Sequence, residues 1–251
     1  MLKNIFIEVG LIARFTGRFF VEVFKPQFEF KEFLRQCFYI GNKSLPLVVI
    51  TAFIMGLVLT MQSRPTLLEF GAQAWLPKMI SVSLIREIAP VITALICAGK
   101  IGSGIGAELG SMKVTEQIDA MDVSGTNPYK FLVVTRVMAT TLMIPLLAIL
   151  ADAVSLYGGY LGCNIKGVVS WDLFWNQIFD TLVFGDILPS IIKTFFFGFV
   201  IGIIGCYQGF NSSKGTEGVG QSANSAVVIS SLLVFIIDLL AVQITDVLNL
   251  N

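Results

Sequence analysis

Five long apolar segments constrain the fold of this 251-residue chain more than any other feature. They cover residues 44–62, 78–107, 130–161, 187–208 and 225–248. Each reaches the roughly 17 residues that a helix needs to cross the hydrocarbon of a bilayer. Helices are required there because lipid offers the backbone no hydrogen-bond partner. We therefore expect an all-α membrane protein with five transmembrane helices.

The composition of the chain supports a polytopic membrane protein with one domain. The sequence is 55% hydrophobic and contains 21 Phe, more than a water-soluble domain of this length needs for its core. No soluble block of domain size interrupts it, so residues 1–251 are expected to form a single membrane domain. Within it we expect an N-terminal interfacial region at residues 1–43 and a transmembrane bundle at 44–248.

The N-terminal 25 residues predict an amphipathic helix. Its charged sector holds Lys3, Glu8, Arg14, Arg18, Glu22 and Lys25, and its apolar face holds Leu2, Ile5, Val9, Ile12, Phe19, Phe20 and Val23. We expect this helix to lie in the membrane interface rather than to cross the membrane. The alternative is a cytoplasmic helix packed on the bundle. The scattered charges also argue against a signal peptide, which needs a continuous apolar core.

The distribution of Lys and Arg predicts the orientation of the chain, because cytoplasmic loops carry an excess of these residues. A cytoplasmic N-terminus puts most of them inside: Lys3, Arg14, Arg18, Lys25, Lys31, Arg35, Lys43, Lys100, Lys113, Lys130, Arg136 and Lys214. The others are Arg64, Lys78 and Lys166 on the outer side, and Arg86 and Lys193 within the membrane. An aromatic and acidic belt is expected at the outer interface, formed by Trp171, Trp175, Asp172, Asp180 and Asp186.

Several chemistries are excluded by the residues that the sequence lacks. There is no His, which removes His-based triads and the commonest zinc ligand. The four Cys residues, at positions 37, 97, 163 and 206, form no CxxC pair that would predict a metal or redox site. No GxxxxGK[ST] phosphate loop is present, so ATP would have to be bound by another subunit.

Glycines in the second apolar segment predict close packing between helices. Gly102, Gly106 and Gly110 recur every four residues, a small-xxx-small spacing that lets helix backbones approach one another. We expect this packing either within the chain or across a homodimer.

The residues that follow these glycines, 113–123, predict a short amphipathic helix in a cytoplasmic loop between the second and third spans. One face carries Val114, Ile118 and Met121, and the polar residues are Glu116, Gln117, Asp119 and Asp122. Such a helix is suited to docking a cytoplasmic partner. The alternative is an ordinary solvated connection along the membrane surface.

Charged residues inside the apolar segments are the candidates for a substrate site, because intramembrane charges are costly and rare. Those placed inside the bilayer, away from the segment ends and the cytoplasmic basic residues named above, are Arg86, Glu87, Asp152, Lys193 and Asp238. The segment boundaries place the first four in the outer half of the membrane, a depth that suits a lipid head group. The alternative is mutual pairing, for example of Glu87 with Lys193, which would hold helices in register.

Two runs of sequence resemble the MlaE family of permeases, also called YrbE, the membrane subunits of ABC-type lipid transporters associated with MCE proteins. These runs are AGKIGSGIGAELGSMKVTEQIDAMDV at residues 98–123 and LIREIAPVITAL at 84–95. The resemblance extends over essentially the whole chain, including IKTFFFG at 192–198 and the final span. It implies a homodimeric permease in the inner membrane of a Gram-negative bacterium, with a cytoplasmic N-terminus and a periplasmic C-terminus.

The function implied by this resemblance is ATP-driven movement of phospholipid between the inner membrane and an MCE-protein conduit toward the outer membrane, which maintains outer-membrane lipid asymmetry. ATP and Mg²⁺ would be bound by a separate cytoplasmic ABC ATPase, so this chain would be no enzyme and would hold no cofactor. The other implied partners are a periplasmic MCE-domain protein and a small cytoplasmic STAS-type accessory protein. The resemblance implies no nucleic-acid partner.

The resemblance also assigns roles to individual residues. The segment Val114–Met121 is expected to couple the permease to the ATPase, with Glu116 as the first choice and Gln117 and Asp119 as supporting contacts. Acyl chains are expected against the first, second and fifth spans. The head group is expected near four charged residues: Arg86, Glu87, Lys193 and Asp238.

Two other classes of function can be compared with this one from the residues alone. A gradient-driven secondary transporter or channel would use Glu87, Asp152 and Asp238 as proton or ion sites. Against it, no inverted duplication is visible, and five spans do not divide into two equal halves. An intramembrane lipid transferase would need a nucleophile with its base, and the sequence shows no such pair.

Overall fold

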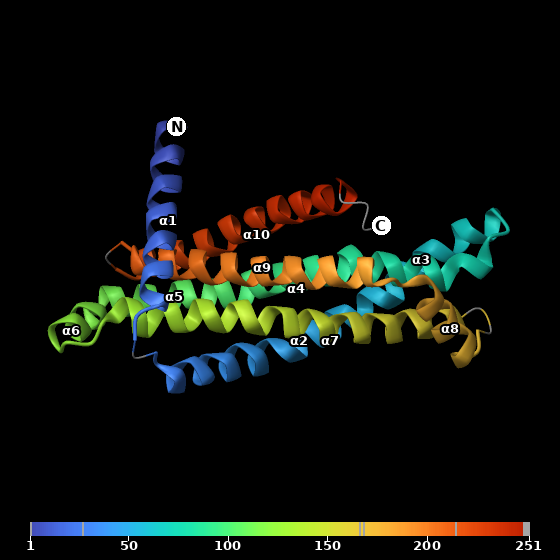
Figure 1. Ribbon diagram of the computed structural model, residues 1–251, viewed down its shortest axis with the longest axis horizontal. Coiled ribbons are helices and arrows are strands. Elements are labelled where there is room, and N and C mark those ends of the chain that lie inside the picture. The colour runs from blue at the N-terminus through green and yellow to red at the C-terminus, as the bar shows by residue number, and fades with distance from the viewer. Residues whose placement is uncertain (1, 27, 166, 168, 214, 248–251) are drawn as a thin grey trace. The chain divides into compact units, whose positions relative to one another are not determined.

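The computed structural model describes residues 2–26, 28–165, 167, 169–213 and 215–247, and long helices dominate this part of the chain (Figure 1). Lys166, Lys214 and Leu248, which entered the predictions above, lie outside the described residues, as do the side chains of residues 2–5. The elements are α1 (Leu2–Val23), α2 (Phe30–Glu69), η1 (Gln73–Trp75), α3 (Leu76–Ser83), η2 (Leu84–Ile88), α4 (Ala89–Cys97), η3 (Ala98–Gly102), α5 (Ser103–Val114), α6 (Gln117–Val123), η4 (Tyr129–Val134), α7 (Thr135–Asn164), α8 (Trp171–Thr181), α9 (Phe184–Phe210) and α10 (Thr216–Val247).

Five helical stretches of the described chain are long and apolar enough to cross a membrane: Phe30–Glu69, Gln73–Val114, Tyr129–Asn164, Phe184–Phe210 and Thr216–Val247. This confirms the expected fold, an N-terminal helix followed by five long apolar helices. The stretches begin earlier than the apolar segments because polar helix formers such as Glu32 continue a helix past its apolar part. The first begins at Phe30 rather than at residue 44, so the expected N-terminal region 1–43 contains the start of α2.

Three of the short elements, η2, η3 and η4, are π-helical, and the sequence explains the first of them. At η2 the N–H of Ala89 donates to the carbonyl of Leu84, five residues back. The next residue, Pro90, has no N–H and cannot supply the ordinary helical bond to the carbonyl of Arg86. The wider turn therefore forms where the sequence places Arg86 and Glu87. A π turn inside an α-helix often marks a functional site.

The chain divides into two compact units, of which the first comprises Met1–Asn42, Cys97–Met143 and Phe197–Val234. Its buried residues include Leu109, Leu132, Val133, Val137, Phe197 and Ile201. Arg136 lies among them and is only 1% exposed, although the charge count placed it with the cytoplasmic basic residues. Its guanidinium donates to the Glu108 carboxylate at 2.9 Å and to the Leu132 carbonyl at 3.0 Å. This buried group therefore joins α5, η4 and α7.

Helix α1 belongs to the first unit and packs on the last part of α9. The ring of Phe15 lies 5.6 Å from that of Tyr207, and the ring of Phe19 lies 5.5 Å from that of Phe199. Phe6 and Phe20 remain exposed, at 75% and 51%. One side of α1 is thus packed on its own unit, while other apolar side chains are exposed.

The second unit comprises Lys43–Ile96, Ile144–Phe196 and Phe235–Asn251. A core of apolar residues joins α3, η2, α7 and α8: Leu76, Ile80, Leu84, Ile85, Leu156, Cys163, Phe174 and Ile178. Ser170 begins α8 by accepting a hydrogen bond from the Leu173 N–H at 3.3 Å. The Trp171 and Trp175 rings lie 5.4 Å apart on α8. Asp186 does not join a belt with them but is buried at 4% exposure.

Candidate functional site

Three polar side chains on one face of α9 hold the π turn η2 within the second unit. They are Asp186, Ser190 and Lys193, at the i, i+4 and i+7 spacing that aligns side chains along a helix. Asp186 pairs with Arg86, and Lys193 donates to the Glu87 carboxylate at 2.7 Å. Between them, the Ser190 hydroxyl donates to the carbonyl of Ile85 at 2.7 Å. The neighbouring charges Arg86 and Glu87 thus have separate partners on α9.

Lys193 is the centre of a three-residue ion cluster. Its ammonium lies 2.7 Å from Glu87 Oε2 and 2.8 Å from Asp238 Oδ1, and the residue is only 4% exposed. Asp238 comes from α10, so the cluster links η2, α9 and α10. The structure therefore shows the pairing of Glu87 with Lys193 that the sequence left open as an alternative to head-group binding. Two carboxyl groups thus share a single buried ammonium.

An apolar pocket of about 650 Å³ lies next to this cluster. Its lining residues are Phe184, Gly185, Leu188, Pro189, Ile192, Lys193, Phe196, Ile237, Leu240, Ala241, Ile244 and Thr245. A smaller pocket of about 80 Å³ is lined by charged residues that include Arg86, Glu87 and Asp186. The two share Gly185, Pro189, Lys193, Ala241 and Thr245, so an apolar space adjoins a charged one. An amphiphilic ligand has this distribution of apolar and polar parts.

The location of the apolar pocket differs from the expectation for acyl chains. The resemblance implied the first, second and fifth spans, whereas this pocket is lined by α9, the fourth span, and α10, the fifth, so the two share only the fifth span. Asp152, the remaining intramembrane charge, has a buried Oδ1 atom with no hydrogen-bond partner among the described residues.

The loop expected to contact an ATPase contains two helices rather than one. The sequence predicted a continuous helix over Val114–Met121, but α5 ends at Val114 and α6 begins at Gln117. Between them Glu116 adopts a left-handed conformation with φ of +58°, which a helix interior does not allow. Val114 therefore lies on the preceding helix and does not share a face with Ile118 and Met121.

The side chains of α6 divide into one anchor and several exposed polar groups. Ile118 is only 3% exposed and fixes the helix on its unit. Glu116, Gln117 and Asp119 are exposed, and Met121 is half-buried. Asp119 lies 2.9 Å from the Lys113 ammonium, which ties α6 back to α5. The polar residues chosen from the sequence are thus at the surface, where a protein partner could contact them.

The glycine-rich part of this span lies against α10 within the first unit. A Cβ at Gly106 would stand 3.2 Å from the Ser222 carbonyl oxygen, and one at Gly110 would stand 2.9 Å from the Ser222 hydroxyl oxygen. A Cβ at Gly102 would meet Ile201 and Ser230 at the longer distances of 3.6 Å and 3.8 Å. These contacts lie within one chain.

Asp186 and Ser190 were not identified as site residues from the sequence. Asp186 stands at the start of α9, where an acidic residue is common at a helix N-terminus and at a membrane interface. Its carboxylate also accepts a hydrogen bond from the Val183 N–H at 3.0 Å. The available signal was the helical spacing of Asp186, Ser190 and Lys193, which places three polar groups on one face of an otherwise apolar helix.

Comparisons with known proteins agree with the resemblance that the sequence suggested. Residues 33–244 match the family described as Permease MlaE. A probable ABC transporter permease of Rickettsia typhi is 38% identical over 237 residues, which cover 94% of this chain and 92% of that protein. A probable ABC transporter permease of Synechocystis is 36% identical, over 90% of this chain and 87% of the relative. The intermembrane phospholipid transport system permease protein MlaE of Haemophilus influenzae is 33% identical, over 88% and 85%.

Proposed function

Because this chain belongs to the MlaE family of ABC transporter permeases, we propose that it is the membrane subunit of a machine that moves phospholipid between the inner membrane and an MCE-protein conduit toward the outer membrane. It is a permease subunit and not the ATPase. The relative named for intermembrane phospholipid transport supports the choice of substrate. In a Gram-negative host, this transport would maintain the lipid asymmetry of the outer membrane.

The observation that carries the proposal is the apolar pocket beside the ion cluster. A phospholipid has acyl chains that suit the surface between α9 and α10 and a phosphate that suits Arg86 and Lys193. In the described structure these cations are held by Asp186, Glu87 and Asp238. A phosphate would have to compete with these carboxylates, which favours transient rather than permanent binding.

The proposed partners follow from this role. The exposed polar residues Glu116, Gln117 and Asp119 would contact a cytoplasmic ATPase that binds ATP and Mg²⁺. We assign the N-terminus to the cytoplasm and the C-terminus to the periplasm, where an MCE-domain protein would receive or deliver lipid. Two copies of the chain and a STAS-type protein on the ATPase would complete the assembly. ATP-driven closure of the ATPases would displace the spans as rigid bodies.

Reconstitution of the chain with its ATPase in phospholipid vesicles tests the proposal. Lipid transfer to an acceptor should require hydrolysable ATP and should be unaffected by collapse of the proton gradient. The Glu116→Lys variant should hydrolyse ATP without lipid transfer, because the reversed charge would weaken the contact between this loop and the ATPase. Glu29→Lys, which reverses an exposed acidic charge outside α6, is the control for surface charge alone. Transfer that follows a proton or ion gradient and ignores ATP would overturn the proposal and favour a secondary transporter.

A further inference from the structure

The segment that follows α6 is held firmly to that helix. The Thr126 N–H donates to the Met121 carbonyl at 3.0 Å, so the chain folds back on α6 as it leaves it. Asn127 Oδ1 then accepts hydrogen bonds from the N–H groups of Tyr129 at 3.1 Å and Lys130 at 3.2 Å. These bonds satisfy donors at the start of η4. We call Asn127–Lys130 the joint, because little of the chain between α6 and η4 is left free to move independently.

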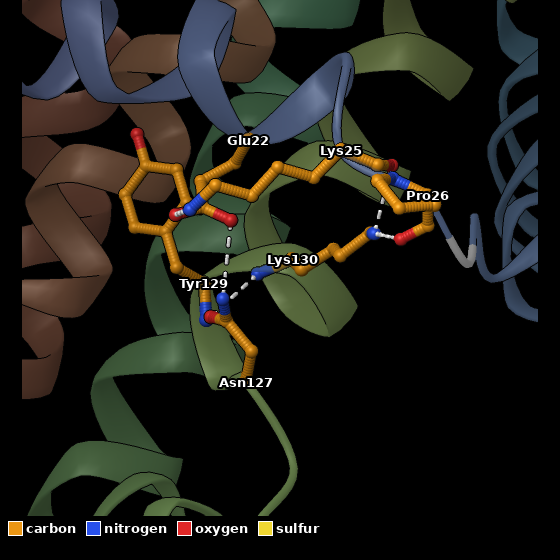
Figure 2. Close-up of polar contacts among 6 residues, drawn as sticks. All are labelled: Glu22, Lys25, Pro26, Asn127, Tyr129 and Lys130. Carbon is orange, nitrogen blue, oxygen red and sulfur yellow. Dashed lines mark hydrogen bonds and ion pairs between the residues drawn. The ribbon is translucent and has the colours of Figure 1, made fainter.

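Three residues of the joint hold the C-terminal half of α1 and the two residues 25 and 26 that follow it. The Asn127 side-chain N–H donates to Glu22 Oε2 at 3.1 Å, and the Tyr129 hydroxyl donates to the Phe15 carbonyl at 2.6 Å. The Lys130 ammonium donates to the Lys25 carbonyl at 3.0 Å and to the carbonyl of the next residue. Figure 2 shows Asn127 pointing toward Glu22, and the Lys130 side chain reaching the backbone of Lys25 and Pro26.

Among these contacts, the hydrogen bond from Asn127 to Glu22 is the one whose loss should weaken the attachment most. Glu22 is only 6% exposed, and its other oxygen accepts a bond from the Lys25 ammonium at 2.6 Å. That ammonium holds the pKa of Glu22 below its ordinary value, so the group is a carboxylate at neutral pH. A buried carboxylate that loses a hydrogen-bond donor is destabilised more than an exposed one. The Arg18 guanidinium, 4.5 Å from the centre of the Tyr129 ring, adds to the same attachment.

The rest of α1 is suited to contact lipid. Phe6 and Val9 precede the attached part and are 75% and 59% exposed. Val21, within the attached part, and Phe24, just after the helix, add exposed apolar surface at 60% and 85%. A helix of 22 residues is about 33 Å long. The polar attachments hold Phe15, Glu22 and the two residues 25 and 26 just after the helix. The turns before Phe15 extend beyond these attachments, so a small rotation at the joint would displace them more than the attached part.

We infer that α1 is an arm that carries the movement of α6 to the lipid at the membrane interface, with Asn127 and Glu22 as positioning residues. This inference rests on the proposed function, because it takes α6 to be the element that the ATPase displaces. It adds a second route from that displacement to the substrate. The spans move directly, and α1 disturbs the lipid beside them through its exposed phenylalanines.

The variant Asn127→Asp separates this attachment from the folding of the loop. Aspartate keeps the acceptor that caps η4 but has no donor for Glu22, so two carboxylates would face each other. We expect lipid moved per ATP hydrolysed to fall about tenfold, while the rate of hydrolysis stays within about twofold. The double variant Asn127→Asp with Glu22→Gln should recover transport, because the Gln amide can donate to the new carboxylate. Thr126→Asp, an added charge at the neighbouring exposed position, is the matched control and should transport normally.

A nitroxide label at position 9 gives a direct readout of the arm. In the unmodified complex its exposure to lipid should differ between the nucleotide-free and ATP-bound states, and Asn127→Asp should abolish that difference. An arm that does not respond to ATP, or an Asn127→Asp variant with normal coupling, would overturn the inference while leaving the proposed function intact. Loss of ATP-dependent transfer in the unmodified complex would instead overturn the proposed function.

Discussion

Removal of the Lys193 ammonium should destabilise the protein, because the structure places two carboxylates against this one buried cation. In Lys193→Met, Glu87 and Asp238 would lose their common partner. Breaking a buried ion pair costs about 3–5 kcal/mol. The Glu87 side chain is 44% exposed and that of Asp238 is 19% exposed, so water would stabilise part of the freed charge. We therefore expect a loss of about 2–3 kcal/mol.

Thermal unfolding of the purified chain in detergent, followed by tryptophan fluorescence, measures this loss. For a chain of 251 residues, a change of about 2–3 kcal/mol corresponds to a fall in Tm of about 4–12 °C. The neutral triple variant Lys193→Met, Glu87→Gln, Asp238→Asn should lose much less, because no charge is left without a partner. A single variant that melts like the unmodified protein would refute the ion cluster.

The triple variant also separates stability from substrate binding. If the ion cluster receives a phosphate, this stable variant should co-purify with less phospholipid, measured by mass spectrometry, and should transfer less lipid in vesicles. Unchanged lipid content and transfer in the folded triple variant would show that the cluster only holds helices together. Its behaviour thus decides between the two interpretations of the intramembrane charges.

Three further predictions concern other parts of the structure. Gly106→Leu should destabilise the chain by about 1–3 kcal/mol because α10 fills the space, whereas Gly104→Leu, at an exposed position where a Cβ would meet nothing within 4 Å, should melt like the unmodified protein. Asp186→Asn should weaken the hold on Arg86 and raise the retention of anionic over zwitterionic lipid, measured by mass spectrometry of purified protein. The lowered pKa of Glu22 means that its contribution to stability is present above its ordinary pKa and is lost as the pH falls through the lowered value, so attachment of α1, measured by proteolysis, should survive at pH 5.

The spans could be predicted from the sequence because their cause is local. A long apolar run in lipid has to be a helix, whatever its neighbours are. The ends could not be located as well, since residues such as Glu32 and Glu69 continue a helix without adding apolar character. The break before α6 was missed because nothing about Glu116 as a residue type indicates a positive φ.

The site was predicted only in part for a related reason. Charged residues are rare in apolar helices and therefore easy to find in the sequence, so Glu87, Lys193 and Asp238 could be named from it. Asp186 could not, because an acidic residue near the start of a helix is ordinary, and only folding places it beside Arg86. The contact of Asn127 with Glu22 joins residues 105 positions apart and leaves no local pattern.

The π turn at Leu84–Ile88 lets one helix pack an apolar face into a core and also place Arg86 and Glu87 against α9. Upstream, Leu76, Ile80 and Leu84 follow an uninterrupted α-helical stripe into their apolar core. The wide turn accommodates one additional residue, which turns everything after it by about 100° relative to a continuous α-helix. Within the second unit, the helix thus packs apolar side chains against α7 and α8 and presents Arg86 and Glu87 to α9 from the turn itself, without a loop that would expose backbone to lipid.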